Sequence, residues 1–126
     1  MARVTEIVAA ARAGIGSRFR AHGREPRFGM DCVGVAAFAF GRQVAGDYPL
    51  RGGTAERIAA RIMGLGLARV ARAEAGDLLL VNGGAGQWHL AIATGEGFVH
   101  ACARLGRVVE TPGLPGPVAA VFRETD

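Results

Sequence analysis

The chain has 126 residues, of which 50% are apolar and 21% are charged, and its net charge is +4. This length fits one domain over residues 1–126, and this composition excludes a disordered chain. No apolar run approaches the roughly 18 residues that cross a membrane, so we expect no membrane span. The first residues, Met1 to Glu6, include an acid and no continuous apolar segment. We therefore expect synthesis in the cytoplasm without a signal peptide.

The basic residues are all arginine and are scattered along the chain. A nucleic-acid surface would gather them, usually with interleaved aromatic residues, so we expect no nucleic-acid partner. Cys32 and Cys102 are the two cysteines. Two cysteines are too few for a disulfide framework, and we expect free thiols in a reducing compartment.

Three segments of the first half have the features of helices. Residues 4–13 place apolar side chains at the spacing of an amphipathic helix. Asp31 is a good N-cap for an apolar helix over residues 32–40, and Thr54 is a good N-cap for a third helix. Residues 17–30 have no periodicity and contain glycine and proline, so they are predicted to form a loop.

The second half contains short apolar runs separated by glycine-rich turns, which is typical of antiparallel strands. The five runs are residues 77–81, 88–94, 98–101, 107–111 and 118–122. We therefore predict an α+β domain, with N-terminal helices packed on a C-terminal antiparallel meander of about five strands, all after residue 76.

Cys32 directly follows the predicted cap, in the first turn of an apolar helix. The start of a helix favours anions and lowers the pKa of a thiol, which makes cysteine a nucleophile at neutral pH. The alternative is a small buried apolar residue, the common role of a free cysteine. From its position alone, both roles are open.

Two histidines favour the catalytic role of Cys32. His89 opens the run 88–94 and His100 lies near the end of the next run, so adjacent antiparallel strands can bring their side chains together. A cysteine, a histidine and a polar group that orients the histidine form the arrangement of cysteine hydrolases. We expect the Cys32 thiol beside one ring nitrogen of His89 and the other ring nitrogen facing His100.

Other polar residues near these positions have plainer interpretations. Cys102 shares a strand face with His100, and we predict packing rather than oxidation onto Cys32. A zinc site from the two histidines and a cysteine lacks the Cys-x-x-Cys type of spacing, so we expect no metal. Trp88 has two open roles, as a core residue or as a platform for sugar or peptide.

Four segments, in this order, resemble the NlpC/P60 cell-wall peptidases. They are Gly-Met-Asp-Cys-Val-Gly-Val at 29–35, Gly-Asp-Leu-Leu at 76–79, His-Leu-Ala-Ile at 89–92 and Gly-Phe-Val-His-Ala at 97–101. The resemblance implies a papain-like fold and a cysteine peptidase without a cofactor. Its substrate would be the stem peptide of peptidoglycan, commonly cut between γ-D-glutamyl and the diamino acid. Cys32 would be the nucleophile, His89 the general base and His100 the orienting residue.

The resemblance also indicates substrate-binding positions, with some departures. Phe19 stands where many members have a tyrosine. His22 either supplies a polar group in place of the missing hydroxyl or is a solvated histidine of the loop. Asp31 and Trp88 complete the expected substrate-binding residues. Ala91 stands where glycine is usual.

Residues 19–34 look most like the branch of this family found in phage tails and gene-transfer agents. This implies tail proteins as partners and delivery to the periplasm or cell wall in a phage-like particle. Two alternatives stay open. One is a non-catalytic tail-assembly or wall-binding protein on the same fold, and the other is a Cys-His amidase or acyltransferase with another substrate.

Overall fold

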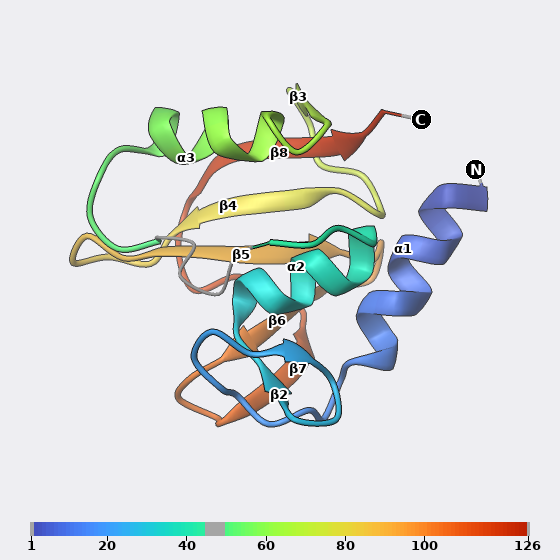
Figure 1. Ribbon diagram of the computed structural model, residues 1–126. Helices are drawn as coiled ribbons and strands as arrows, with labels where there is room; N and C mark the ends of the chain where they lie inside the picture. The colour runs from blue at the N-terminus through green and yellow to red at the C-terminus, as the bar shows by residue number, and fades with distance from the viewer. Residues whose placement is uncertain (1, 45–49, 126) are drawn as a thin grey trace.

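The computed structural model describes residues 2–44 and 50–125, in which helices cover a long, twisted sheet (Figure 1). The three helices of this part are α1 (Ala2–Ala13), α2 (Cys32–Phe40) and α3 (Ala55–Met63). They pack on a six-stranded antiparallel sheet made of β3 (Leu67–Val70), β4 (Leu78–Asn82), β5 (Trp88–Ala93), β6 (Phe98–Cys102), β7 (Arg107–Thr111) and β8 (Val118–Glu124). The predicted α+β class is confirmed. None of the described helices is long and apolar enough to cross a membrane.

The order of the strands differs from the predicted meander. The sheet runs β3-β8-β4-β5-β6-β7, so β8 returns across the sheet and lies between β3 and β4. The five predicted strands are present, but β3 precedes residue 76, and the expectation that the sheet contains only later residues is wrong. Strand β3 has four residues, two of them exposed, and this is too short for a periodic signal.

The segment predicted to be a loop, residues 17–30, also contains a small hairpin. Strands β1 (Arg24–Glu25) and β2 (Gly29–Met30) pair in the antiparallel sense. The hairpin contacts the start of α2, so it borders the site described below.

Helix α2 forms because its ends are well capped and its sides are buried. The Asp31 carboxylate accepts a hydrogen bond from the Gly34 amide at 2.9 Å, and Gly41 ends the helix in the left-handed conformation. Eight of its nine residues are buried, and it packs on α1, β5 and β6. The predicted helix and its N-cap are confirmed, and the helix fixes the position of Cys32 against the sheet.

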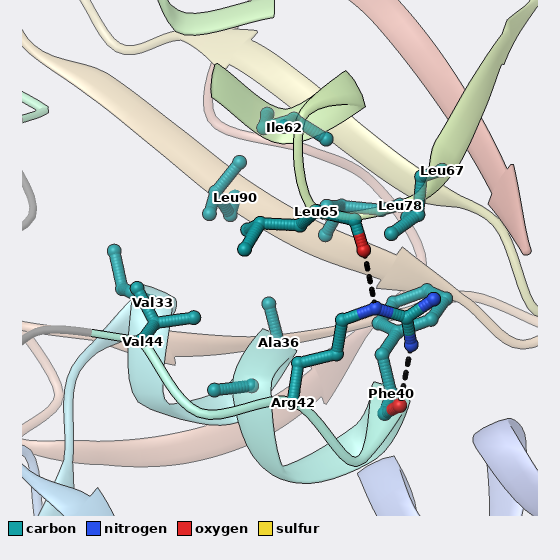
Figure 2. Close-up of a pocket in the computed structure, with 11 residues that line it drawn as sticks. Val33, Ala36, Phe40, Arg42, Val44, Ile62, Leu65, Leu67, Leu78 and Leu90 are labelled. Carbon is teal, nitrogen blue, oxygen red and sulfur yellow. Dashed lines mark hydrogen bonds between the residues drawn. The ribbon is translucent and has the colours of Figure 1, made fainter.

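Arg42 joins the end of α2 to the turn after α3, as Figure 2 shows, and also to β8. Its guanidinium donates to the carbonyl oxygens of Leu65 and Phe40, and it pairs with the Glu124 carboxylate at 2.6 Å. This pair is the main reason that the pKa of Glu124 is lowered to about 2. Arg42 also borders an apolar pocket between α2, the turn after α3 and the sheet, and Val33 and Leu90 lie in its wall. The helix that carries Cys32 is therefore held at both ends.

Gly34 allows the first turn of α2 to approach the loop before it. A Cβ at this position would lie 2.1 Å from the carbonyl oxygen of Gly23, a backbone atom that cannot move without moving the loop. We expect Gly34→Ala to lower the free energy of unfolding by about 1–3 kcal/mol, the usual cost of overpacking, although alanine favours helices. Urea denaturation measures the change. Gly64→Ala at the end of α3, with no contact under 3.3 Å, is the control; equal effects of the two substitutions would contradict the expectation.

Candidate active site

Three elements bring the predicted catalytic residues to one cleft. Cys32 is the first residue of α2, His89 is the second residue of β5, and His100 is in the middle of β6. All three line the same cleft. The pairing of β5 with β6 joins Ile92 to Val99 and Ala93 to Phe98, at the ends of the strands away from His89. Helix α2 packs on both of these strands.

The two histidines are in direct contact. His89 Nε2 lies 2.9 Å from His100 Nδ1, and the rings meet edge to face with their centroids 5.0 Å apart. His100 is buried, and its other nitrogen, Nε2, lies 3.0 Å from the hydroxyl oxygen of Thr111. This geometry places one ring nitrogen of His89 against His100, as the strand pairing predicts.

Cys32 is buried, and its sulfur faces backbone amides. The amides of Leu90, Cys32 and Val33 are directed at the sulfur and lower its pKa, but burial raises it more, and the Asp31 charge adds to the rise. The result is a pKa of about 12 for the thiol. The expectation of a lowered pKa is therefore wrong, because loss of hydration outweighs the start of the helix. Across residues 2–44 and 50–125, no hydrogen bond joins Cys32 to His89; the sulfur faces the Leu90 amide instead.

The pKa of His89 changes in the opposite direction. Burial, followed by the neighbouring His100, lowers it from 6.5 to about 4, and burial also lowers the pKa of His100. At neutral pH, Cys32 is therefore a thiol and both imidazoles are uncharged. A proton would have to pass from the sulfur to His89 during a reaction rather than before it.

Asp31 and His22 border the cleft, and Asp31 is fully engaged within the protein. One carboxylate oxygen accepts hydrogen bonds from the Gly34 amide and from Arg24, each at 2.9 Å, and the other accepts from the His22 amide at 2.7 Å. His22 is exposed and adopts a positive φ of 65°. Asp31 thus ties the loop that carries His22 to the helix that carries Cys32.

Phe19 and Trp88 also line the cleft, and both pack against the core. Their backbone amides fix them in place: that of Phe19 donates to Gly106 and that of Trp88 donates to Leu50, each at 2.8 Å. The indole nitrogen of Trp88 is buried without a hydrogen-bond partner among the described residues. Of the two roles left open for Trp88, packing against the core is observed, and its place in the cleft leaves the role of a platform for sugar or peptide as a prediction.

Several cleft residues were not selected from the sequence. Arg51 and Arg104 bring positive charge to the cleft, and both lie in segments without periodicity. Thr111 ends β7. The register of the β6–β7 hairpin pairs Thr111 with Phe98, near His100, and this register is the sequence feature from which Thr111 could have been predicted. Cys102 is half-buried, is a free thiol like Cys32 and lines the same cleft. In the described ranges, no three His, Cys, Asp or Glu side chains are grouped to hold a metal ion.

Comparison with solved structures finds the same fold in two peptidoglycan hydrolases and in the P60 domain of an antigen. The NlpC/P60 domain of the peptidoglycan hydrolase SagA has a TM-score of 0.62 at 26% identity, over 97% of this chain and 98% of that chain. The P60 domain of an antigen from M. avium subspecies paratuberculosis has a TM-score of 0.62 at 17% identity, over 98% and 94%. The peptidoglycan hydrolase RipB from Mycobacterium tuberculosis has a TM-score of 0.61 at 20% identity, over 98% of this chain and 64% of that chain.

No protein-family profile matches the sequence, and no curated protein matches it. The structural matches extend over almost the whole chain. The chain therefore has the NlpC/P60 domain fold and is similar in structure to peptidoglycan hydrolases.

Proposed function

We propose that this protein, which has the fold of NlpC/P60 peptidoglycan hydrolases, is a cysteine peptidase that cleaves amide bonds in peptidoglycan stem peptides. The observation that carries the proposal is the hydrogen-bonded pair of His89 and His100 in the cleft that also holds Cys32 at the start of α2. In this assignment Cys32 is the nucleophile, His89 the general base and His100 the residue that orients His89.

The reaction begins with the neutral thiol and imidazole described above. Because Nε2 of His89 is bound to His100, the free nitrogen Nδ1 is the one that accepts the thiol proton. The Cys32 side chain rotates from the Leu90 amide toward this nitrogen, and its sulfur attacks the carbonyl carbon of the substrate amide. The Cys32 amide, at the positive end of α2, stabilises the oxyanion.

Collapse of the tetrahedral intermediate breaks the carbon–nitrogen bond. His89 returns its proton to the leaving amine, and the acyl group stays on Cys32. A water molecule then gives a proton to His89 and attacks the thioester. The carbon–sulfur bond breaks, the proton on His89 returns to the sulfur, and the carboxylic acid is released. No cofactor takes part in these steps.

The bond that we propose is the one between γ-D-glutamyl and the diamino acid. A γ-linked glutamyl residue keeps a free α-carboxylate next to the cleaved amide. The positive charges of Arg51 and Arg104 in the cleft wall support an anionic peptide of this kind. Phe19, His22 and Trp88 would contact the rest of the stem peptide from the same cleft.

We further propose that the protein works as a part of a phage-like tail that carries it to the cell wall. The support for this setting is the resemblance of residues 19–34 to the tail-associated branch of the family. Co-purification with tail particles, detected by mass spectrometry of the particles, tests it; particles that lack the protein would contradict it.

Digestion of purified peptidoglycan tests the proposed reaction. The wild-type protein is expected to release fragments that end in γ-D-glutamate and fragments that begin with the diamino acid, both identified by mass spectrometry. Folded Cys32→Ala should release neither, whereas Cys102→Ala removes the other thiol and should still cleave. Release of intact stem peptides would instead indicate an amidase, and no release by the wild type would favour the non-catalytic alternative.

The pH dependence of cleavage follows from the pKa of His89. Below this pKa the imidazole carries a proton and cannot accept one from the thiol, so kcat/KM falls as the pH falls through it. Since the pKa is lowered from 6.5 to about 4, we expect the acid limb of the kcat/KM profile near pH 4. Rates with a soluble stem peptide measure the profile, and circular dichroism at each pH excludes unfolding. An acid limb at pH 6.5 or above would contradict the expectation.

A further inference from the structure

We propose that Thr111 is a positioning residue that sets which nitrogens of His89 and His100 carry protons. The inference rests on the proposed cysteine-peptidase function, because its consequence is a base nitrogen on His89 that is free to accept the thiol proton. Thr111 contacts His100, which contacts His89, so Thr111 acts only through the histidines.

The hydrogen bond from Thr111 to Gly113 sets the direction of the hydrogen bonds made by His100 and His89. The Thr111 hydroxyl donates to the Gly113 carbonyl oxygen at 2.7 Å, and this uses its single proton. Toward His100, 3.0 Å away, the same hydroxyl can therefore only accept. The proton in that bond must come from His100, so Nε2 of His100 carries a hydrogen.

The same reasoning gives the positions of the ring hydrogens in His100 and then in His89. A neutral imidazole has one N–H group, so His100 Nδ1 has a lone pair and accepts from His89 Nε2 at 2.9 Å. His89 then carries its hydrogen on Nε2, and its Nδ1 is unprotonated. The lowered pKa values of both histidines support the neutral state on which this count depends.

Without the Thr111 hydroxyl, the opposite arrangement becomes available. His100 could then carry its hydrogen on Nδ1 and donate to His89, which would place the hydrogen of His89 on Nδ1. In that arrangement His89 presents an N–H group where the base nitrogen is needed. The Thr111 hydroxyl thus determines whether Nδ1 of His89 is free to accept the thiol proton.

The backbone around Thr111 holds the hydroxyl in place. Thr111 ends β7 opposite Phe98, and Gly97 before it lets the strands approach closely; a Cβ at Gly97 would lie 2.5 Å from the Thr111 carbonyl oxygen. Threonine is also restricted in χ1 because its Cβ is branched. The strand pairing and the branched Cβ therefore restrict the direction of the hydroxyl.

Nuclear magnetic resonance of the ring nitrogens tests the proton positions directly. In the free wild-type protein at neutral pH, we expect His89 and His100 both to be protonated at Nε2. Thr111→Val keeps the shape and removes the hydroxyl, and it should shift His100 toward the Nδ1–H form, whereas Thr111→Ser should keep the wild-type form. An Nδ1–H form of His100 in the wild type, or unchanged tautomers in Thr111→Val, would overturn the proposal.

Kinetics with a soluble stem peptide test the consequence for the base. We expect Thr111→Val to lower kcat about tenfold, the equivalent of one ordinary hydrogen bond, with KM within about twofold, and Thr111→Ser to restore kcat. An unchanged kcat in Thr111→Val would overturn the positioning role. The two proposals fail separately: a wild type with Nε2–H histidines and no cleavage disproves the function, and an active wild type with an Nδ1–H His100 disproves the inference.

Discussion

Cys32→Ser is expected to abolish cleavage of stem peptides, with a fall in kcat on the order of 10⁶, as when a hydrolase loses its nucleophile. Serine resembles cysteine in shape, but its hydroxyl is far less acidic than a thiol. The site is buried, and the pKa of His89 is already lowered to about 4, so His89 cannot remove a hydroxyl proton at a useful rate. Initial rates with a soluble stem peptide measure the loss.

The second cysteine provides the control for this substitution. Cys102→Ser makes the same chemical change in the same cleft, on β6 instead of at the start of α2, and should retain cleavage. Thermal unfolding of both variants shows whether the fold is kept. A rate for Cys32→Ser within tenfold of the wild type would exclude Cys32 as the nucleophile.

His89→Gln is expected to lower kcat by about 10²–10⁴, the usual contribution of general acid–base catalysis. The glutamine amide can still donate a hydrogen bond to His100, so the strand ends should keep their arrangement, but it has no nitrogen that can accept the thiol proton. We therefore expect KM to change little and the acid limb of the pH profile to disappear. Steady-state kinetics across the pH range measure these effects.

A contrary result for His89 would be informative about the roles of the two histidines. If His89→Gln keeps kcat within tenfold while His100→Gln loses it, the base would be His100 and the assignment would reverse. The ring nitrogens of His89 and His100 lie 2.9 Å apart, so the kinetics of both variants are needed to distinguish the two assignments.

The parts of the fold that the sequence predicts are those with strong local signals. Helix α2 has an N-cap, a continuous apolar run and a terminal glycine, and strands β4 to β7 are separated by tight glycine turns. The place of β8 could not be predicted, because an apolar run does not say which strands lie beside it. In β4, Leu78 and Leu80 join the core under the helices and Leu79 and Val81 join a second cluster on the other face, so both faces are buried and the apolar pattern does not distinguish its neighbours.

The site was predictable to the extent that it depends on strand neighbours. His89 and His100 lie on consecutive strands, and their contact follows from one hairpin. The pKa of Cys32 was not predictable, because it depends on how completely the core covers the sulfur, and the sequence shows only the helix start. Thr111 was missed because its role depends on the direction of a hydrogen bond to Gly113, a detail of the loop after β7.

The position of β8 also governs how the chain can fold during synthesis. Strand β3 pairs with β8, and Leu67 faces Glu124, more than fifty residues later. Until residues 118–124 leave the ribosome, β3 has no partner in the sheet. One edge of β4 is then unpaired, and its leucines, which are buried in the folded protein, are uncovered on that side. Closing such a long loop is slow, and open apolar edges invite pairing with other chains. The nascent protein should therefore be most vulnerable to aggregation just before β8 joins the sheet.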